Sequence, residues 1–121
     1  MELRKKDAIR IQHMIDACLK TQQFISHKTR TDLDKDEQLS YALVRLIEII
    51  GEAAVKVTPE TKERYSSIVW KDIIGTRNRL IHGYDDVNLD IVWQIVSVDI
   101  EELVAQLQEI LKELNIRQQL F

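Results

Sequence analysis

The chain has 121 residues and a mass of 14.2 kDa, which leaves room for one domain built around one hydrophobic core. Hydrophobic residues make up 45% and charged residues 31% of the chain, a composition that excludes both a disordered tail and a membrane protein. Only three Gly and one Pro occur, whereas all-β folds with many tight turns need more of both. We therefore predict one all-α domain over residues 1–121, with its core at about 4–114.

The formal net charge of −3 argues against a general binder of polyanions. The charges are unevenly distributed, however. Residues 61–84 carry five basic and two acidic side chains, whereas residues 85–121 carry two and eight. If the basic residues of 61–84 lie together, they form one positive strip on an otherwise acidic protein.

Two amphipathic helices are predicted in the first half of the chain, because apolar residues recur at spacings of three and four over about 4–27 and 36–57. The stretch 26–36 between them is polar and is interpreted as a loop. Within it, Asp32 or Asp34 is placed to cap the second helix.

Gly51 lies inside the second helix, where a glycine costs about 1 kcal/mol relative to alanine. Close approach of a neighbouring helix would compensate for this cost, and a mild kink is the alternative explanation. Thr58 and Pro59 end the helix, because proline lacks an amide hydrogen and disfavours helical geometry in its predecessor. One further helical turn is possible at 60–65.

A third helix is predicted over about 68–81, with Ser66 or Ser67 as its cap and Gly83 placed to end it. A fourth helix begins near Asn88 and continues nearly to the C-terminus. Four amphipathic helices joined by short loops predict an antiparallel bundle of four to five helices.

Several apolar residues of the second and fourth helices fall outside a single apolar stripe. Excess apolar surface on a small bundle is often an interface, so these residues predict a homodimer. They are Ile49, Val92, Val96, Ile100 and Val104.

The segment 75–84 concentrates the reactive side chains of the sequence, Arg77 and His82 among them. A guanidinium is a permanently charged fork that matches phosphate oxygens, and an imidazole exchanges protons near neutral pH. Together they suffice to cleave RNA without a metal: the imidazole removes the proton of a 2′-hydroxyl, that oxygen attacks the adjacent phosphate, and the guanidinium stabilises the developing charge. DNA lacks this hydroxyl and should stay intact.

Capping is the alternative explanation, since arginine and histidine both interact favourably with the negative end of a helix. On one continuous helix Arg77 and His82 would also point about 140° apart. Asn78 and Arg79 would instead lie on the same side as His82. Arg77 and His82 therefore meet at one phosphate only if the helix unwinds near Gly83, or if a second chain completes the site.

The sequence resembles the HEPN superfamily and, within it, the HepT-like toxins of HepT/MntA toxin–antitoxin systems. The resemblance rests on the motif Arg77-Asn78, three residues, His82, with Tyr84 two places further on. Flanking features agree over about residues 4–114: Ile50 to Ala53 reads Ile-Gly-Glu-Ala, Trp70 precedes the motif, Asp72 to Gly75 reads Asp-Ile-Ile-Gly, and Val92-Trp93 opens the fourth helix.

This resemblance implies a homodimeric toxin of a type VII toxin–antitoxin system, acting as a metal-independent endoribonuclease on cellular RNA with no cofactor. It implies that Arg77 and His82 are catalytic and that Asn78 supports them. It also implies a partner, an MntA-like nucleotidyltransferase antitoxin that silences the toxin by transferring AMP to Tyr84. A supporting role for Arg79 in RNA binding follows from the predicted positive strip.

A non-catalytic helical module that binds a nucleotidyltransferase, and nucleotide or RNA, is the alternative function. The charged N-terminus lacks the apolar stretch of a secretion signal, and no run approaches the ~18 apolar residues of a membrane span. We expect a cytoplasmic protein that does not contact a membrane.

The remaining candidate residues have structural interpretations. A single cysteine is most simply a buried core residue, and the two histidines near the first helix are predicted at the surface without a metal. The tryptophans are expected to pack in the core rather than stack on bases. Two glutamates four residues apart are expected at a solvated or interface edge of their helix, where a nearby arginine compensates their negative charge. These residues are Cys18; His13 and His27; Trp70 and Trp93; and Glu48 and Glu52 with Arg45.

Overall fold

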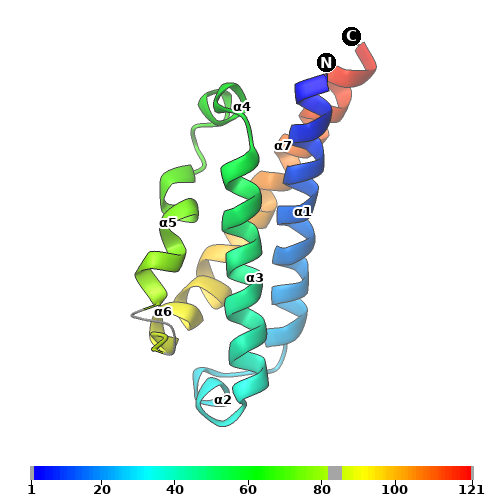
Figure 1. The fold of residues 1–121 in the computed structure, drawn as a ribbon. Helices are drawn as coiled ribbons and strands as arrows, with labels where there is room; N and C mark the ends of the chain where they lie inside the picture. Colours follow the sequence, from blue (N-terminus) through cyan, green and yellow to red (C-terminus); the bar gives the residue numbers. More distant parts are fainter. Residues whose placement is uncertain (1, 82–85, 121) are drawn as a thin grey trace.

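A computed structural model describes residues 2–81 and 86–120, and within these ranges the chain consists of helices joined by short turns and loops, with one isolated antiparallel bridge between Ile81 and Val87. Helix α1 packs against both α3 and α7 and runs antiparallel to them, while α5 packs on α3 and runs in the direction of α1 (Figure 1). The predicted antiparallel all-α bundle is therefore confirmed. Its elements are α1 (Glu2–Ile25), α2 (Arg30–Lys35), α3 (Glu37–Lys56), α4 (Pro59–Arg64), α5 (Trp70–Leu80), α6 (Leu89–Gln94), the π-helical segment η1 (Ile95–Asp99) and α7 (Ile100–Leu120).

One hydrophobic core lies between the long helices. The long helices α1, α3 and α7 contribute buried side chains spaced three or four residues apart, and these pack together in the middle of the bundle. The two chain ends lie at the same end of the bundle (Figure 1). No helix in the described ranges has the length and apolar character needed to cross a lipid bilayer. The largest fully buried side chains include Ile11, Met14, Leu43, Leu80 and Leu107.

The predicted loop over 26–36 is wrong in part, because it contains α2. The carboxylate of Asp32 accepts a hydrogen bond from the backbone N–H of Thr29 at 2.6 Å, which satisfies an amide at the start of this helix and lowers the pKa of the Asp32 carboxyl. The predicted cap of α3 is also wrong. Asp36, not Asp32 or Asp34, accepts from the backbone N–H of Leu39 at 3.0 Å, because it is the residue directly before the helix.

Helix α5 begins later than predicted, at Trp70 with Val69 in the N-cap position, so capping by Ser66 or Ser67 is wrong. The indole of Trp70 explains this start, since its Nε1 donates to the carbonyl of Tyr65 at 3.2 Å and the residue is only 7% exposed. A buried aromatic side chain with a satisfied N–H fixes the position of the first turn. The prediction that Trp70 packs in the core is confirmed.

The fourth predicted helix is a rod made of α6, η1 and α7, and it begins where expected. The side chain of Asn88 accepts from the backbone N–H groups of Asp90 and Ile91 at 3.1 and 3.2 Å. Asn88 is therefore the N-cap of α6, at the position where the sequence predicts that the helix begins. The π-helical turn shifts the register of the buried face between α6 and α7, a change that apolar periodicity does not reveal.

The apolar residues that motivated the homodimer prediction are used inside a single chain. Val92, Val96, Ile100 and Val104 are all less than 9% exposed, and Ile49 is half-buried against the core. The rod packs on α1 along most of its length, and α6 also packs on α2, α3 and α5, so more than one of its faces is covered. Packing within one chain thus explains the apolar residues outside the single stripe, and no second copy of the chain is needed to cover them.

Gly51 lets α5 approach α3 closely, as predicted. A Cβ built on Gly51 would lie 3.3 Å from the backbone carbonyl oxygen of Ile73, whereas one built on Gly75 in α5 meets nothing within 4 Å. We expect Gly51→Val to lower the free energy of unfolding by about 1–3 kcal/mol through overpacking. The matched change Gly75→Ala should raise it by about 0.5–1 kcal/mol through helix propensity. Urea unfolding measures both, and stabilisation by both would contradict the close approach.

Cys18 is fully buried in α1, as predicted, and burial raises the pKa of its thiol to about 12. Only a thiolate reacts with disulfide reagents, so native protein should remain unlabelled at pH 8 while urea-unfolded protein reacts fully. The thiol of the unfolded chain ionises near pH 8.5, whereas the buried thiol stays protonated up to a pH of about 12. The free energy of unfolding should therefore fall as the pH rises from about 8.5 towards 12. Rapid labelling of the native chain at pH 8 would show that this part of the core opens readily.

Candidate functional site

The exposed end of α5 carries Arg77, Asn78 and Arg79 in its last turn. The helix ends at Leu80, and Ile81 is extended, with φ −109° and ψ 117°. Helical geometry therefore stops before residue 82, one residue from the predicted end at about 81. His82, Gly83 and Tyr84 lie outside the described residues, so the predictions for these side chains stay predictions.

Residues on both sides of this segment are held together by backbone contacts. Asn88 donates its backbone N–H to the carbonyl of Leu80 at 2.7 Å, and Ile81 and Val87 form the antiparallel bridge. Leu80 itself is fully buried. The segment that contains His82 and Tyr84 thus starts and ends at adjacent, anchored backbone positions beside the last turn of α5.

Arg77 reaches across to α3. Its Nε lies 3.9 Å from Oε2 of Glu48, and Nη1 of Arg45 lies 3.8 Å from the same oxygen. The Arg77 side chain is 63% exposed, whereas that of Glu48 is 24% exposed. An exposed ion pair contributes less than about 1 kcal/mol to the stability of the fold. This contact therefore orients the guanidinium without preventing it from binding a phosphate.

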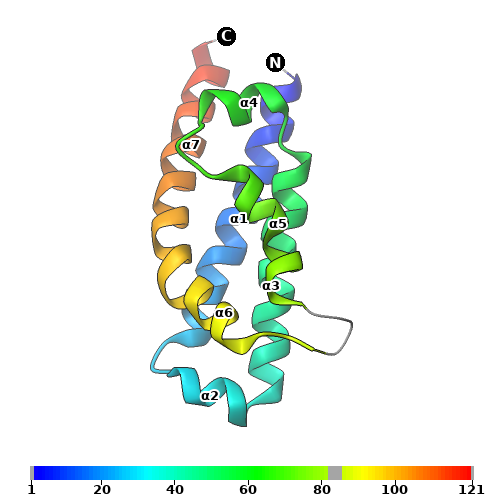
Figure 2. The same ribbon diagram turned by 90° about the vertical axis from the view of Figure 1, so that its left-hand side faces the viewer.

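Arg79 faces a different part of the surface. It lines a cavity of about 300 Å³ between α5, η1 and α7, together with Asp72, Asp99 and Glu102. Figure 2 shows α5 and α7 on opposite sides of this face. Positions two residues apart on a helix differ by about 200°, so the predicted single positive strip is wrong for Arg77 and Arg79. The structure does not bring these two arginines together.

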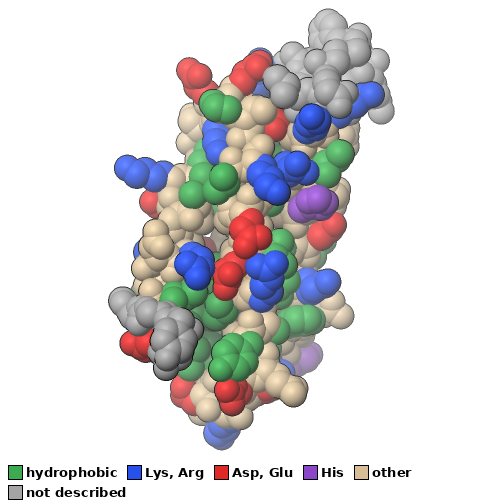
Figure 3. Space-filling view, in the orientation of Figure 1, with side chains coloured by type: hydrophobic (Ala, Val, Ile, Leu, Met, Phe, Trp, Pro, Cys, Tyr) green, Lys and Arg blue, Asp and Glu red, His purple; other side chains and the backbone are tan. Residues whose placement is uncertain are grey.

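The charged residues on the outer side of α3 form a compact cluster with Arg77 (Figure 3). Arg45 Nη1 also lies 3.1 Å from Glu52 Oε1, which confirms the predicted compensation of Glu48 and Glu52 by Arg45. The sequence gives no signal for the contact between Glu48 and Arg77, because it joins different helices. It is the part of the site that the sequence prediction missed.

The other candidate residues behave as structural side chains. His13 and His27 are exposed, as predicted. Trp93 is partly buried and packs against the core, which confirms the structural interpretation of this residue.

Comparison with known proteins finds a matching family model and several relatives. Residues 14–110 match the model of the family described as "Ribonuclease HepT-like". A protein of Caldanaerobacter subterraneus named "Putative RNase TTE0752" is 37% identical over 103 residues, covering 85% of this chain and 92% of that protein. "Probable ribonuclease HepT" of Thermococcus cleftensis is 31% identical over 77 residues, covering 64% of this chain and 70% of that protein.

A third relative is longer than this chain. "Gamma-glutamylcyclotransferase and putative RNase MJ0434" of Methanocaldococcus jannaschii is 33% identical over 113 residues, which cover 93% of this chain but 51% of that protein. No solved structure matches the chain. With a family model that covers most of the helical bundle, the chain belongs to the HepT-like ribonuclease family, which places it among RNA-cleaving enzymes.

Proposed function

We propose that this protein is a metal-independent endoribonuclease in which Arg77 and His82 act on one phosphodiester. The observation that carries the proposal is the exposed guanidinium of Arg77 on the last turn of α5. His82 follows five residues later, in a segment whose two ends are anchored by backbone contacts. The imidazole takes the proton of the 2′-hydroxyl or returns one to the leaving 5′-oxygen. The guanidinium stabilises the negative charge that develops on the phosphate oxygens. Asn78, exposed beside Arg77, supports substrate binding.

The physiological role that we propose is the toxin of a type VII toxin–antitoxin system in the cytoplasm, assembled as a homodimer. Its partner is an MntA-like nucleotidyltransferase antitoxin that transfers AMP to Tyr84. An adenylyl group there places a phosphate and a purine two residues from His82 in the sequence. The added anion would compete with RNA for Arg77, and the base would obstruct access to the site.

The activity is tested with purified protein, total RNA and an excess of EDTA, with His82→Ala beside the wild-type chain. We expect the wild-type protein to degrade RNA and the variant to leave it intact, because removal of the proton-transfer group removes its contribution to catalysis, typically 10²–10⁴-fold. Equal and inert profiles of the two proteins would favour the alternative, a non-catalytic module that binds a nucleotidyltransferase and nucleotide or RNA. Cleavage that EDTA abolishes would contradict the metal-independent mechanism.

Silencing of the toxin should depend on the phenol of Tyr84. We expect Tyr84→Phe to cleave RNA at the wild-type rate but to stay active after incubation with the nucleotidyltransferase and ATP, because the acceptor oxygen is absent. The intact mass reports the modification, since only the wild-type chain should gain one AMP. The control is Tyr41→Phe, which removes a phenol from the exposed side of α3 and should be silenced normally. A Tyr84→Phe variant that the partner still silences completely would show that another residue is modified.

A further inference from the structure

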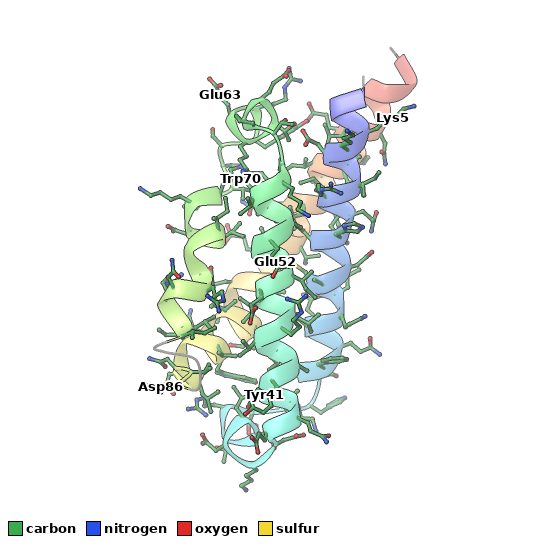
Figure 4. The ribbon with its side chains drawn as sticks, in the orientation of Figure 1. Lys5, Tyr41, Glu52, Glu63, Trp70 and Asp86 are labelled. Carbon is green, nitrogen blue, oxygen red and sulfur yellow. The ribbon has the colours of Figure 1, made fainter. Side chains whose placement is uncertain are left out.

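A hollow of about 200 Å³, here called the α1–α3 hollow, lies on the surface between these two helices. Figure 4 labels Glu52 on the α3 side of it, and Figure 3, in the same orientation, shows basic side chains and a histidine gathered over α1 and α3. Three of its six lining residues carry N–H donors on basic or imidazole groups. The lining consists of Arg10, His13, Ile49, Glu52, Ala53 and Lys56.

Helix periodicity brings the polar side chains of the hollow together. Arg10 and His13 are three residues apart in α1. Glu52 and Lys56 are four residues apart in α3. Residues at these spacings are neighbours on one side of a helix, and α1 packs against α3. Two permanently charged cations and an imidazole therefore line one small depression.

The two cations of the hollow, Arg10 and Lys56, form no ion pair within the described parts of the chain. The Nε of Arg10 is buried and has no hydrogen-bond partner among the described residues. A buried donor without an acceptor is unfavourable and rare in folded proteins. An acceptor oxygen that enters the hollow would relieve this cost, so the arrangement indicates an anion site.

Glu52 brings a negative charge to the same lining, but an arginine compensates it. Its Oε1 lies 3.1 Å from Nη1 of Arg45, rather than beside Lys56 one turn further along α3. The hollow and its immediate surroundings therefore keep an excess of positive charge, on a chain whose formal net charge is −3. A local positive surface on an acidic protein attracts a phosphate at this place and not elsewhere.

The hollow is connected to Arg77 along the surface of α3. Arg77 contacts Glu48, and Glu48 also contacts Arg45. Arg45 in turn contacts Glu52, which lines the hollow. Glu48 and Lys56 are eight residues apart, or about 12 Å along the helix. A nucleic-acid strand with one phosphate at Arg77 thus reaches the hollow within a few nucleotides.

We infer that the α1–α3 hollow binds a backbone phosphate of the RNA substrate, a few nucleotides from the bond that is cut. The inference rests on the proposed ribonuclease function. The guanidinium of Arg10 and the ammonium of Lys56 hold the phosphate oxygens, and His13 donates from a ring N–H. A phosphate contact carries no sequence information, so its effect is to position the strand at Arg77.

RNA binding by the His82→Ala chain tests this site without the complication of cleavage. A fluorescent RNA dodecamer is titrated at several salt concentrations, and its anisotropy gives Kd. Each phosphate contact to a single strand adds about 0.7 to the slope of log Kd against log salt, which is about fivefold in affinity at 0.1 M salt. In this background we expect Lys56→Gln to bind about fivefold more weakly. Arg10→Gln/Lys56→Gln should bind about 25-fold more weakly, with a slope smaller by about 1.4.

The matched control is Lys35→Gln/Lys112→Gln, which removes two positive charges from exposed positions on α2 and α7. It should keep the slope of the parent chain and bind within about twofold of it, because distant charges are screened. Lys56 is exposed, so Lys56→Gln reports on the hollow even where replacement of Arg10 destabilises the fold. Parental affinity and slope in Lys56→Gln, or an equal loss in the control, would overturn the inference.

A free nucleotide offers the same phosphate chemistry as RNA, and AMP distinguishes the two sources. Calorimetric titration with millimolar AMP should give no binding that depends on Lys56, because a mononucleotide lacks the neighbouring phosphate that engages Arg77. AMP binding that Lys56→Gln abolishes, with RNA binding unchanged, would show that the hollow holds a free nucleotide. This result would also overturn the inference.

Cleavage rates separate failure of the phosphate site from failure of the proposed activity. With His82 intact, Arg10→Gln/Lys56→Gln should raise KM for the dodecamer and leave kcat unchanged. It should cut a dinucleotide at the wild-type rate, because that substrate is too short to reach the hollow. Cleavage of the dodecamer with the wild-type KM would overturn the phosphate site alone. Weaker RNA binding by the variants, with no cleavage by the wild-type chain, would support the site and contradict the ribonuclease mechanism.

Discussion

Arg77→Ala should slow RNA cleavage in EDTA by about 10²–10³-fold, mostly through kcat. A preorganised donor aimed at the charge that forms in the transition state typically contributes this much. The folded state should be little affected, because the Arg77 side chain is 63% exposed and its ion pair with Glu48 is weakly held. Initial rates on a fluorescent RNA and a urea unfolding curve measure the two effects separately.

Two further variants test the role of the guanidinium itself. Arg77→Lys keeps the positive charge but loses the planar fork, so its rate should fall between those of the wild type and Arg77→Ala. Arg79→Ala removes an arginine from the same turn but from the acidic cavity between α5 and α7, and it should reduce the rate by less than about threefold. Wild-type cleavage by Arg77→Ala, or an equally large loss in Arg79→Ala, would contradict the assigned site.

Asp7→Ala should lower the free energy of unfolding by about 2–4 kcal/mol. The carboxylate of Asp7 is 1% exposed and accepts hydrogen bonds from the backbone N–H of Thr58 at 3.0 Å, from the Thr58 hydroxyl at 2.6 Å and from the Thr61 hydroxyl. These contacts fasten α1 to the start of α4. Truncation removes the acceptor from the buried hydroxyl of Thr61 and from two partly buried donors of Thr58, and the loss is large for a domain of this size.

The matched control is Asp16→Ala on the same helix. Asp16 is exposed and accepts one hydrogen bond, from Gln12 at 2.8 Å, so its loss should change the free energy of unfolding by less than about 0.5 kcal/mol. Thr61→Val tests the network from its other side and should recover part of the cost of Asp7→Ala when the two are combined, because one orphaned donor is removed. Equal stabilities of Asp7→Ala and Asp16→Ala would show that the buried network contributes nothing.

The long helices were predictable from the sequence because each has a continuous apolar period and a clear terminator. The predicted range 36–57 lies within one residue of α3 at both ends, since Pro59 prevents its continuation. Helix α2 was missed because six residues carry too little periodicity, and its start depends on the local bond between Thr29 and Asp32.

The candidate site could be predicted only as far as local chemistry determines it. The motif and the exposed position of Arg77 follow from α5 alone. The contact of Arg77 with Glu48 and the burial of Asp7 depend on packing between segments that are far apart in the sequence. No single-sequence pattern encodes such contacts. The tertiary structure likewise decides that Val92 and Val104 face the interior of one chain rather than an interface.

Attack by the 2′-hydroxyl is the central claim about the chemistry, and one substrate pair tests it directly. Two RNA oligomers are compared in EDTA, one entirely ribonucleotide and one with a single 2′-deoxy sugar on the 5′ side of the cleaved bond. We predict that the first is cut to a 2′,3′-cyclic phosphate and a 5′-hydroxyl end, and that the second is not cut at that bond. Cleavage beside the deoxy sugar, or products with 5′-phosphate ends, would contradict the mechanism.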